Sequence, residues 1–225
     1  MLPLRQSLSL SGAACYEAKF LVPAGRATEI LDWARNALTP DQHVDPATGF
    51  YRVTTLYLDT PGGAVLEQRG SHAYRKYRVR RYEDAALVHL ERKLKRDGRV
   101  RKTRWLAPLA EWPEPGQAHW FHRRILASQL QPAAVVAYQR AAFFGGNFRL
   151  TLDRGLRISA TREPHVRLGH DALAILDGEW ILEVKHGGLL PVPVRDCVLR
   201  HRLVPGRFSK YRDGMRLLRD APAHA

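Results

Sequence analysis

The sequence predicts a mainly β fold of the α+β type, in which about eight antiparallel strands form a barrel with flanking helices. Many short segments alternate apolar and polar side chains, as strands with one buried face do. Turn residues join neighbouring segments as hairpins, among them Asp97-Gly98 and Gly145-Gly-Asn. Few helices interrupt this series, and short strands at such spacing favour a closed or nearly closed barrel.

The first expected strand covers residues 16–22, where apolar and polar residues alternate. Pro23 then begins a helix over 24–38, and Pro40 ends it because proline cannot continue a helix. Further strands are expected at 51–59, 74–83, 86–95, 99–106, 133–144, 147–153, 156–161, 173–176 and 180–185, the last two as a hairpin turned at Asp177-Gly178. Further helices are expected over 64–69, 119–130, 191–199 and 209–218.

The composition fits a globular protein with an anionic partner. The chain has 225 residues, 45% of them hydrophobic, and we expect a flexible lead at 1–14, one domain at 15–220 and a tail at 221–225. Lys and Arg number 36 against 22 Asp and Glu, which gives a net charge of +14. Such an excess faces nucleic acid, phosphate chains, nucleotides or a membrane surface, and charge alone does not choose among them.

Nothing in the sequence indicates export or insertion into a membrane. Two cysteines, Cys15 and Cys197, are too few for a disulfide framework. The first eleven residues lack a sustained apolar run, so we expect no signal peptide. No stretch approaches the ~20 apolar residues that span a bilayer. We therefore expect a soluble cytoplasmic protein.

Two adjacent strands carry the most informative pattern, Lys76-Tyr-Arg-Val-Arg-Arg-Tyr and Leu90-Glu-Arg-Lys-Leu-Lys. Residues two apart share a strand face, so Lys76, Arg78 and Arg80 point one way. A solvated surface is the ordinary interpretation of one such strand, but the pattern recurs along the chain and favours a polar tunnel lined mostly by cations. The further alternate charged positions are Glu17, Lys19, Glu91, Lys93, Arg140, Arg149, Glu183 and Lys185.

These residue types suit phosphate chemistry. Arg offers forked donors that match phosphate oxygens, and Lys offers a compact charge. The carboxylates Glu17, Glu91 and Glu183 suit Mg²⁺ or Mn²⁺, which bridge protein oxygens to substrate phosphates. The alternative is that Glu17 with Lys19, or Glu183 with Lys185, forms a simple surface pair, and Asp153 is interpreted as a turn or barrel-rim residue. No Gly-x-x-x-x-Gly-Lys loop and no Cys or His cluster at zinc spacing is present.

An ordered set of motifs across residues 16 to about 218 resembles the VTC domain, the polyphosphate polymerase member of the CYTH or triphosphate tunnel metalloenzyme superfamily. The matching segments are Tyr16-Glu-Ala-Lys-Phe, Thr55-Leu-Tyr-Leu-Asp, Tyr77-Arg-Val-Arg-Arg-Tyr, Leu90-Glu-Arg-Lys, Arg101-Lys-Thr-Arg, Tyr138-Gln-Arg-Ala-Ala-Phe, Phe148-Arg-Leu-Thr-Leu-Asp, Ile181-Leu-Glu-Val-Lys and Phe208-Ser-Lys-Tyr. The resemblance implies an antiparallel tunnel barrel. It also implies transfer of the γ-phosphate of ATP onto inorganic polyphosphate or pyrophosphate with a divalent metal.

The resemblance also implies roles for particular residues. The positions expected to hold nucleotide phosphates or the polymer at the reaction centre are Lys19, Arg78, Arg80, Lys93, Arg140 and Arg149. Further contacts to the polymer are expected from Lys102, Lys185, Arg207, Ser209 and Lys210. Glu183 resembles the family's metal-binding glutamate, with Glu17 and Glu91 as further candidates for Mn²⁺ or Mg²⁺.

The first strand departs from the pattern of hydrolytic relatives. They usually carry Glu-x-Glu-x-Lys, and here Cys15, Glu17 and Lys19 stand at these positions. This difference favours polymer synthesis over triphosphate hydrolysis, with an inorganic triphosphatase as the alternative. A non-catalytic polyphosphate-binding module is a third possibility, and no nucleic acid is expected in a narrow tunnel. The SPX domain and membrane helices of eukaryotic polymerase subunits have no counterpart here, so coupling to a membrane requires a partner chain.

Overall fold

The computed structural model describes residues 15–97, 99–112 and 119–221. Eight antiparallel strands follow one another in the order β7-β3-β4-β5-β6-β1-β10-β8, and β8 pairs with β7 to close the ring. Their bounds are β1 Cys15–Pro23, β3 Tyr51–Asp59, β4 Arg75–Tyr82, β5 Leu87–Arg96, β6 Arg99–Pro108, β7 Gln131–Gly145, β8 Phe148–Ala160 and β10 Glu179–His186. Two short strands, β2 Thr39–Pro40 and β9 Leu173–Ala174, pair with β7 and β8. The predicted mainly β barrel is confirmed.

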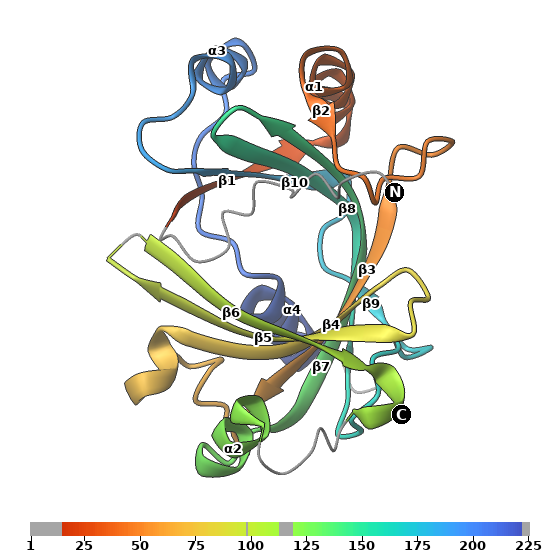
Figure 1. The fold of residues 1–225 in the computed structure, drawn as a ribbon, viewed down its shortest axis with the longest axis vertical. Coiled ribbons are helices and arrows are strands. Elements are labelled where there is room, and N and C mark those ends of the chain that lie inside the picture. The colour runs from red at the N-terminus through yellow and green to blue at the C-terminus, as the bar shows by residue number, and fades with distance from the viewer. Residues whose placement is uncertain (1–14, 98, 113–118, 222–225) are drawn as a thin grey trace, which may run out of the picture.

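Four α-helices lie around the barrel: α1 Ala24–Ala37, α2 Trp120–Ala127, α3 Val192–Arg200 and α4 Lys210–Asp220. Two short 3₁₀ helices, η1 Gly70–Ala73 and η2 Leu109–Glu111, complete the set in the described residues. In Figure 1, α1 and α3 lie above β1, β10 and β8, whereas α2 lies below β4, β5 and β6. None of these helices is long and apolar enough to cross a bilayer.

The apolar cores lie between the barrel wall and the helices. On one side, Phe20 and Val22 of β1 pack with Ile30 and Leu31 of α1. On the other side, apolar residues of β4 and β5 pack with Phe121 of α2. Because successive strand residues point to opposite faces, burying these side chains outward turns their charged neighbours into the barrel.

Helix α4 is anchored to the opposite wall by a buried carboxylate. The hydroxyl of Tyr211 donates to Asp59 Oδ2 at 2.6 Å. The same carboxylate accepts the backbone N–H groups of Val65 and Leu66. These bonds hold the N-terminal end of α4, with its capping residue Ser209, against the barrel.

Three element predictions are wrong in detail. Residues 64–69 form turns, not a helix, because Gln68 has a left-handed backbone conformation, with φ of 55°, that an α-helix cannot contain. The strands expected at 147–153 and 156–161 are one strand, β8, which accommodates an extra residue at Gly155 with φ of 60°. The segments 173–176 and 180–185 do not form a hairpin, since β9 and β10 both pair with β8.

Some predictions lie wholly or partly outside the described residues. The expected lead at 1–14 and positions 222–225 of the tail are among them, as is Gly98 of the Asp97-Gly98 turn. The strands on either side of that turn do pair as antiparallel neighbours, up to Arg96 and Arg99.

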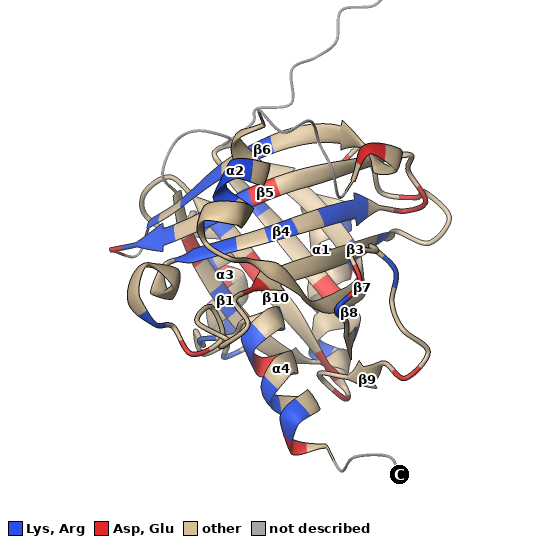
Figure 2. Cartoon of the chain, turned by 90° about the horizontal axis from the view of Figure 1, so that it is seen from below, with Lys and Arg blue, Asp and Glu red and all other residues tan. Residues whose placement is uncertain are grey.

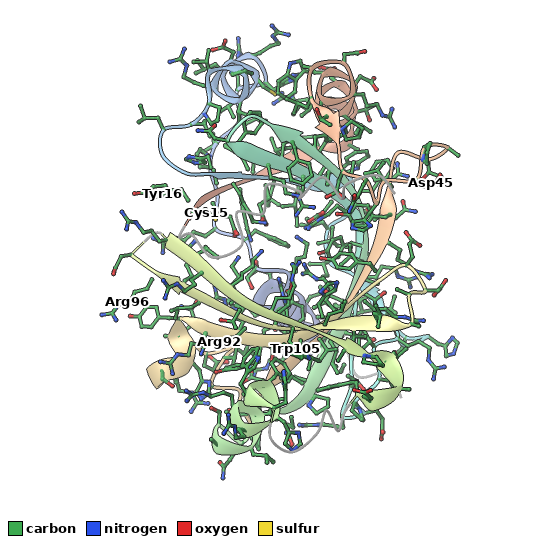
Figure 3. The ribbon with its side chains drawn as sticks, viewed as in Figure 1. Cys15, Tyr16, Asp45, Arg92, Arg96 and Trp105 are labelled. Atoms are coloured by element: carbon green, nitrogen blue, oxygen red, sulfur yellow. The ribbon has the colours of Figure 1, made fainter. Side chains whose placement is uncertain are left out.

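The seam between β1 and β6 is short. Within the described residues, these strands pair at Cys15 with Val100 and at Tyr16 with Arg99, whereas β1 pairs with β10 along eight positions. Figure 3 shows Cys15 and Tyr16 on the same side of the view as Arg96, near the end of the β5–β6 hairpin.

Candidate functional site

A cavity of about 590 Å³, part of it open to solvent, occupies the barrel interior. It is lined by Lys19, Tyr57, Lys76, Arg78, Arg80, Tyr82, Lys93, Lys102, Arg104, Tyr138, Arg140, Arg149, Glu183, Lys185, Ser209 and Lys210. These residues come from all eight barrel strands and from the start of α4. Eleven of the sixteen are Lys or Arg and one is a carboxylate, so the cavity is strongly cationic. Figure 2 shows Lys and Arg recurring along β4 and at α4.

Most predicted site residues meet in this cavity. The predicted residues that line it are Lys19, Arg78, Arg80, Lys93, Lys102, Arg140, Arg149, Glu183, Lys185, Ser209 and Lys210. Glu17 and Glu91 are not part of the cavity lining but form ion pairs with the lining residues Lys93 and Arg78. Arg207 does not line the cavity and is exposed, because it lies in the segment before α4 and its side chain reaches solvent.

The arginines of β4 are held by one buried carboxylate. Glu91 Oε2 lies 2.6 Å from Arg78 Nη2, and Glu91 Oε1 lies 2.6 Å from Arg104 Nη2. Arg80 approaches the same carboxylate at 4.0 Å. Burial raises the pKa of Glu91, but Arg78 and the neighbouring cations outweigh it and hold that pKa well below its usual value. Glu91 is thus an ionised counter-charge that fixes two guanidinium groups.

A second buried carboxylate organises the far wall. Asp153 bonds Arg140 through both oxygens, at 2.6 and 2.7 Å, and lies 2.7 Å from Lys210 Nζ. Burial raises the pKa of Asp153, but Arg140 and Lys210 lower it to about 2. The interpretation of Asp153 as a turn or rim residue is therefore wrong. Its spacing from Arg149 on the same strand was the signal that could have placed it inside.

Arg149 forms an ion pair with a loop residue that the alternating strand pattern could not predict. Its Nη2 lies 2.7 Å from Asp41 Oδ2 and 3.3 Å from the hydroxyl of Tyr51. Asp41 follows the short strand β2 and has no periodic partner in the sequence, so sequence reasoning missed it. Sequence reasoning also missed Arg104 and the lining tyrosines. The tyrosines were missed because Tyr is most often a packing residue.

Glu17 and Glu183 are neighbours and fit a divalent cation as a pair. Lys19 Nζ lies 3.4 Å from Glu17 and 3.6 Å from Glu183, so the two carboxylates converge on one point. Lys93 lies 2.8 Å from Glu17, and Lys185 lies 2.6 Å from Glu183. Burial and Glu183 raise the pKa of Glu17, but the three lysines lower it to about 2, which keeps it ionised as a metal ligand must be.

The candidate cation site needs ligands from a substrate. Two carboxylates supply too few oxygens for Mg²⁺ or Mn²⁺, whose remaining positions phosphate oxygens and water can fill. No group of three or more His, Cys, Asp or Glu side chains converges in the part of the chain that the structure describes. Glu91 does not belong to this pair, because its oxygens bond to Arg78 and Arg104.

Two lysines of the lining lack a carboxylate partner among the described residues, Lys76 and Lys102. Lys76 Nζ donates to Ser209 Oγ at 2.6 Å. Burial, and then Arg212, lowers the pKa of Lys76 well below its usual value. Lys185, and then burial, does the same to Lys102. An anion in the cavity would reverse both shifts.

Comparisons with known proteins agree with this architecture. A structure described as a putative adenylate cyclase from Bacillus halodurans superposes with a TM-score of 0.55 at 15% identity, covering 87% of this chain and 93% of that one. One from Vibrio parahaemolyticus gives 0.54 at 13% identity, with 89% and 98% covered. A putative adenylyl cyclase from Hippeastrum, described as having a dominant triphosphatase activity, gives 0.50 at 11% identity, with 85% and 89% covered. These likenesses show a shared fold.

No curated protein matches the chain significantly. The family model of the VTC domain, in contrast, matches residues 14–219, nearly the whole sequence. That range includes every barrel strand and all cavity-lining side chains. The chain therefore belongs to the VTC domain family.

Proposed function

We propose that this protein is a polyphosphate polymerase that transfers the γ-phosphate of ATP to the end of an inorganic polyphosphate chain. The observation that carries the proposal is the excess of Lys and Arg in the lining of the barrel cavity, which contains a single carboxylate. Burying uncompensated cations is costly, so a cavity of this kind is most stable when a polyanion fills it. A linear phosphate chain presents the same charged unit at every step, which suits a tunnel.

The strand register supports the same ligand. Lys93 stands directly opposite Lys102 in the β5–β6 pair, and Lys185 stands opposite Arg149 in the β10–β8 pair. Like charges at directly opposed positions destabilise a sheet. Phosphates between them would turn this repulsion into attraction.

The reaction needs no protein nucleophile. A terminal oxygen of the chain attacks the γ-phosphorus, the bond to the β-phosphate oxygen breaks, and ADP leaves while the chain gains one phosphate. Arg78 and Arg140, fixed by Glu91 and Asp153, hold the transferring group in line with the attacking oxygen and stabilise its charge. They act as preorganised donors because their own partners already orient them.

A divalent cation at Glu17 and Glu183 would neutralise charge on the phosphates. The cation would compete with Lys19, Lys93 and Lys185 for the two carboxylates, and the phosphates would compete with the carboxylates for these lysines. In the presence of substrate, these ammonium groups can bind phosphate oxygens instead. The identity of the cation, Mn²⁺ or Mg²⁺, is part of the test below.

Hydrolysis is the second candidate, supported by the dominant triphosphatase activity described for the Hippeastrum protein of similar fold. Cys15 argues against it. Its Sγ lies 3.9 Å from the carbonyl oxygen of Val100 and the residue is buried, where hydrolytic relatives usually carry a glutamate. Gel analysis of products from ATP and short polyphosphate separates the candidates. A lengthening ladder with matching ADP indicates a polymerase, free phosphate alone a hydrolase, and binding without turnover a polyphosphate-binding module.

The cation assignment is tested by Glu183→Gln in that assay with Mn²⁺ and with Mg²⁺. We expect turnover to fall at least 100-fold while tripolyphosphate still binds, because the amide keeps the shape and loses the charge that holds the cation. Glu179→Gln, on the same strand and outside the cavity, is the matched control. Normal turnover in Glu183→Gln would refute the assignment.

A further inference from the structure

One mouth of the cavity carries a cluster of aromatic rings. Tyr51 begins β3 and Tyr82 ends β4, so both stand at the same rim of the barrel. Their ring centroids are 5.9 Å apart, and His89 lies 5.2 Å from Tyr82. The ring of His43 is nearly parallel to that of Tyr82, with an angle of 11° and a centroid distance of 6.4 Å. We call these four side chains the aromatic rim.

The aromatic rim adjoins the groups that would hold phosphates. Tyr82 itself lines the cavity, and the Arg80 guanidinium lies 6.0 Å from the centre of its ring. Arg149 bonds to Tyr51 and, through Asp41, to the loop that carries His43. The backbone N–H of His43 donates to Asp41 at 3.1 Å. A ligand with a flat ring and a phosphate tail could thus place its ring against the aromatic side chains and its phosphates against the guanidinium groups.

The opposite mouth has a different character. Lys76, near the start of β4, lies six residues from Tyr82, about 20 Å along an extended strand. It faces Ser209 at the N-terminal end of α4, and Lys210 lies beside them in the cavity lining. In Figure 3, Asp45, from the loop that carries His43, lies on the opposite side of the view from Arg96. At the Lys76 mouth, ammonium groups and a hydroxyl of the cavity lining therefore lie together.

We propose that the aromatic rim binds the nucleobase of the nucleoside triphosphate, so that the nucleotide enters by this mouth and the phosphate chain extends toward the Lys76 mouth. This rests on the proposed function, because it assigns the two ends of the same substrate pair to the two ends of the cavity. Stacking of a base on aromatic side chains is worth about 1–3 kcal/mol and tolerates any base, since every base has a π face.

His89 adds a polar atom to the rim. Its Nδ1 is buried and has no hydrogen-bond partner among the described residues, so it is available to the edge of a base. Burial, and then Arg104, lowers the pKa of His89 to about 4, which keeps the ring neutral at pH 7. A neutral imidazole can donate or accept one hydrogen bond without adding charge.

The test is calorimetric titration of the full chain with ATP and with inorganic tripolyphosphate, which has the same phosphates and no base. We expect His43→Ala to weaken ATP binding about fivefold or more and to leave tripolyphosphate binding within about twofold. His43 is exposed, so this change should not affect folding. Tyr82→Leu is a second variant, which removes the stacking ring and keeps an apolar side chain.

Tyr74→Ala is the matched control, because Tyr74 is an exposed aromatic residue just before β4, at the other end of that strand. It should change neither affinity. A selective loss of ATP binding in Tyr74→Ala, or unchanged ATP binding in both rim variants, would overturn the inference while the wild type still bound tripolyphosphate. Failure of the wild type to bind either compound would instead refute the proposed function, and the inference with it.

Discussion

Two parts of the cavity wall carry the same sign of charge but differ in how that charge is compensated. The arginines of β4 and β7 are bonded to carboxylates, Arg78 to Glu91 and Arg140 to Asp153. The lysines Lys76 and Lys102 have no carboxylate partner in the described chain. We call Arg78 and Arg140 with their carboxylates the arginine wall, and Lys76 and Lys102 the lysine wall. The arginine wall is therefore preorganised without a ligand, whereas the lysine wall is most stable when an anion is bound.

Under the proposed function, this difference would give the two walls separate tasks. Fixed guanidinium groups can orient a transferring phosphoryl group without reorganising during the reaction. Ammonium groups whose pKa is lowered by burial and by other cations gain most from a phosphate chain that passes beside them. Positioning and polymer binding are thus separable properties, and mutations should divide them.

The largest effect should come from breaking the arginine wall. Glu91→Gln removes a fully buried counter-charge that Arg78, itself buried, shares with the half-exposed Arg104, so the free energy of unfolding should fall by about 3 kcal/mol. Urea unfolding measures it. Glu67→Gln, which removes a surface partner of Arg219, is the control and should cost less than about 1 kcal/mol. Equal losses in the two variants would contradict the comparison.

Mutation of the lysine wall should raise the free energy of unfolding instead of lowering it. Lys76→Met removes a half-buried ammonium group that has Ser209 as its hydrogen-bond partner in the described chain, so the ligand-free protein should gain about 1 kcal/mol in unfolding free energy. The same variant should bind tripolyphosphate more weakly than wild type. Lys95→Met, an exposed residue of β5, should change neither quantity. Loss of stability in Lys76→Met would show that this lysine is compensated after all.

A smaller effect should appear as a dependence on pH. Burial lowers the pKa of Lys93 from 10.5 to about 8, although Glu17 opposes the shift. Below pH 8 the Lys93 side chain is protonated in both the folded and the unfolded state, and burying its charge lowers the free energy of unfolding. Between about pH 8 and 10.5 the folded state alone releases the proton, so this cost is lost as pH rises. A bound phosphate chain would raise the pKa again, so binding near pH 8.5 should take up protons.

Calorimetric titration with tripolyphosphate in buffers of different ionisation enthalpy measures that uptake. Lys93→Met should reduce it, while Lys76 and Lys102 account for the remainder. Proton release on binding, or an uptake that Lys93→Met leaves unchanged, would mean that Lys93 does not face the ligand.

The alternating pattern of the sequence predicted much of this wall. Period-two spacing placed Arg78, Arg80 and Lys93 inside, because the strand geometry fixes which residues share a face. It could not identify the partners that the closed barrel brings together, such as Asp153 with Lys210. It also missed Asp41, which lies in a loop, whereas Arg207, expected from the resemblance alone, is exposed outside the cavity lining. Pairing across a barrel depends on register and on connecting segments, which local spacing does not encode.

The most direct test of the account is titration of the full chain with inorganic tripolyphosphate, compared with a variant that carries both Lys76→Met and Lys102→Met. The account predicts saturable binding at one site per chain, weaker by at least tenfold in the double variant and weaker for both proteins as salt rises. No saturable binding, or equal affinity of the two proteins, would contradict the claim that the cavity binds a phosphate chain.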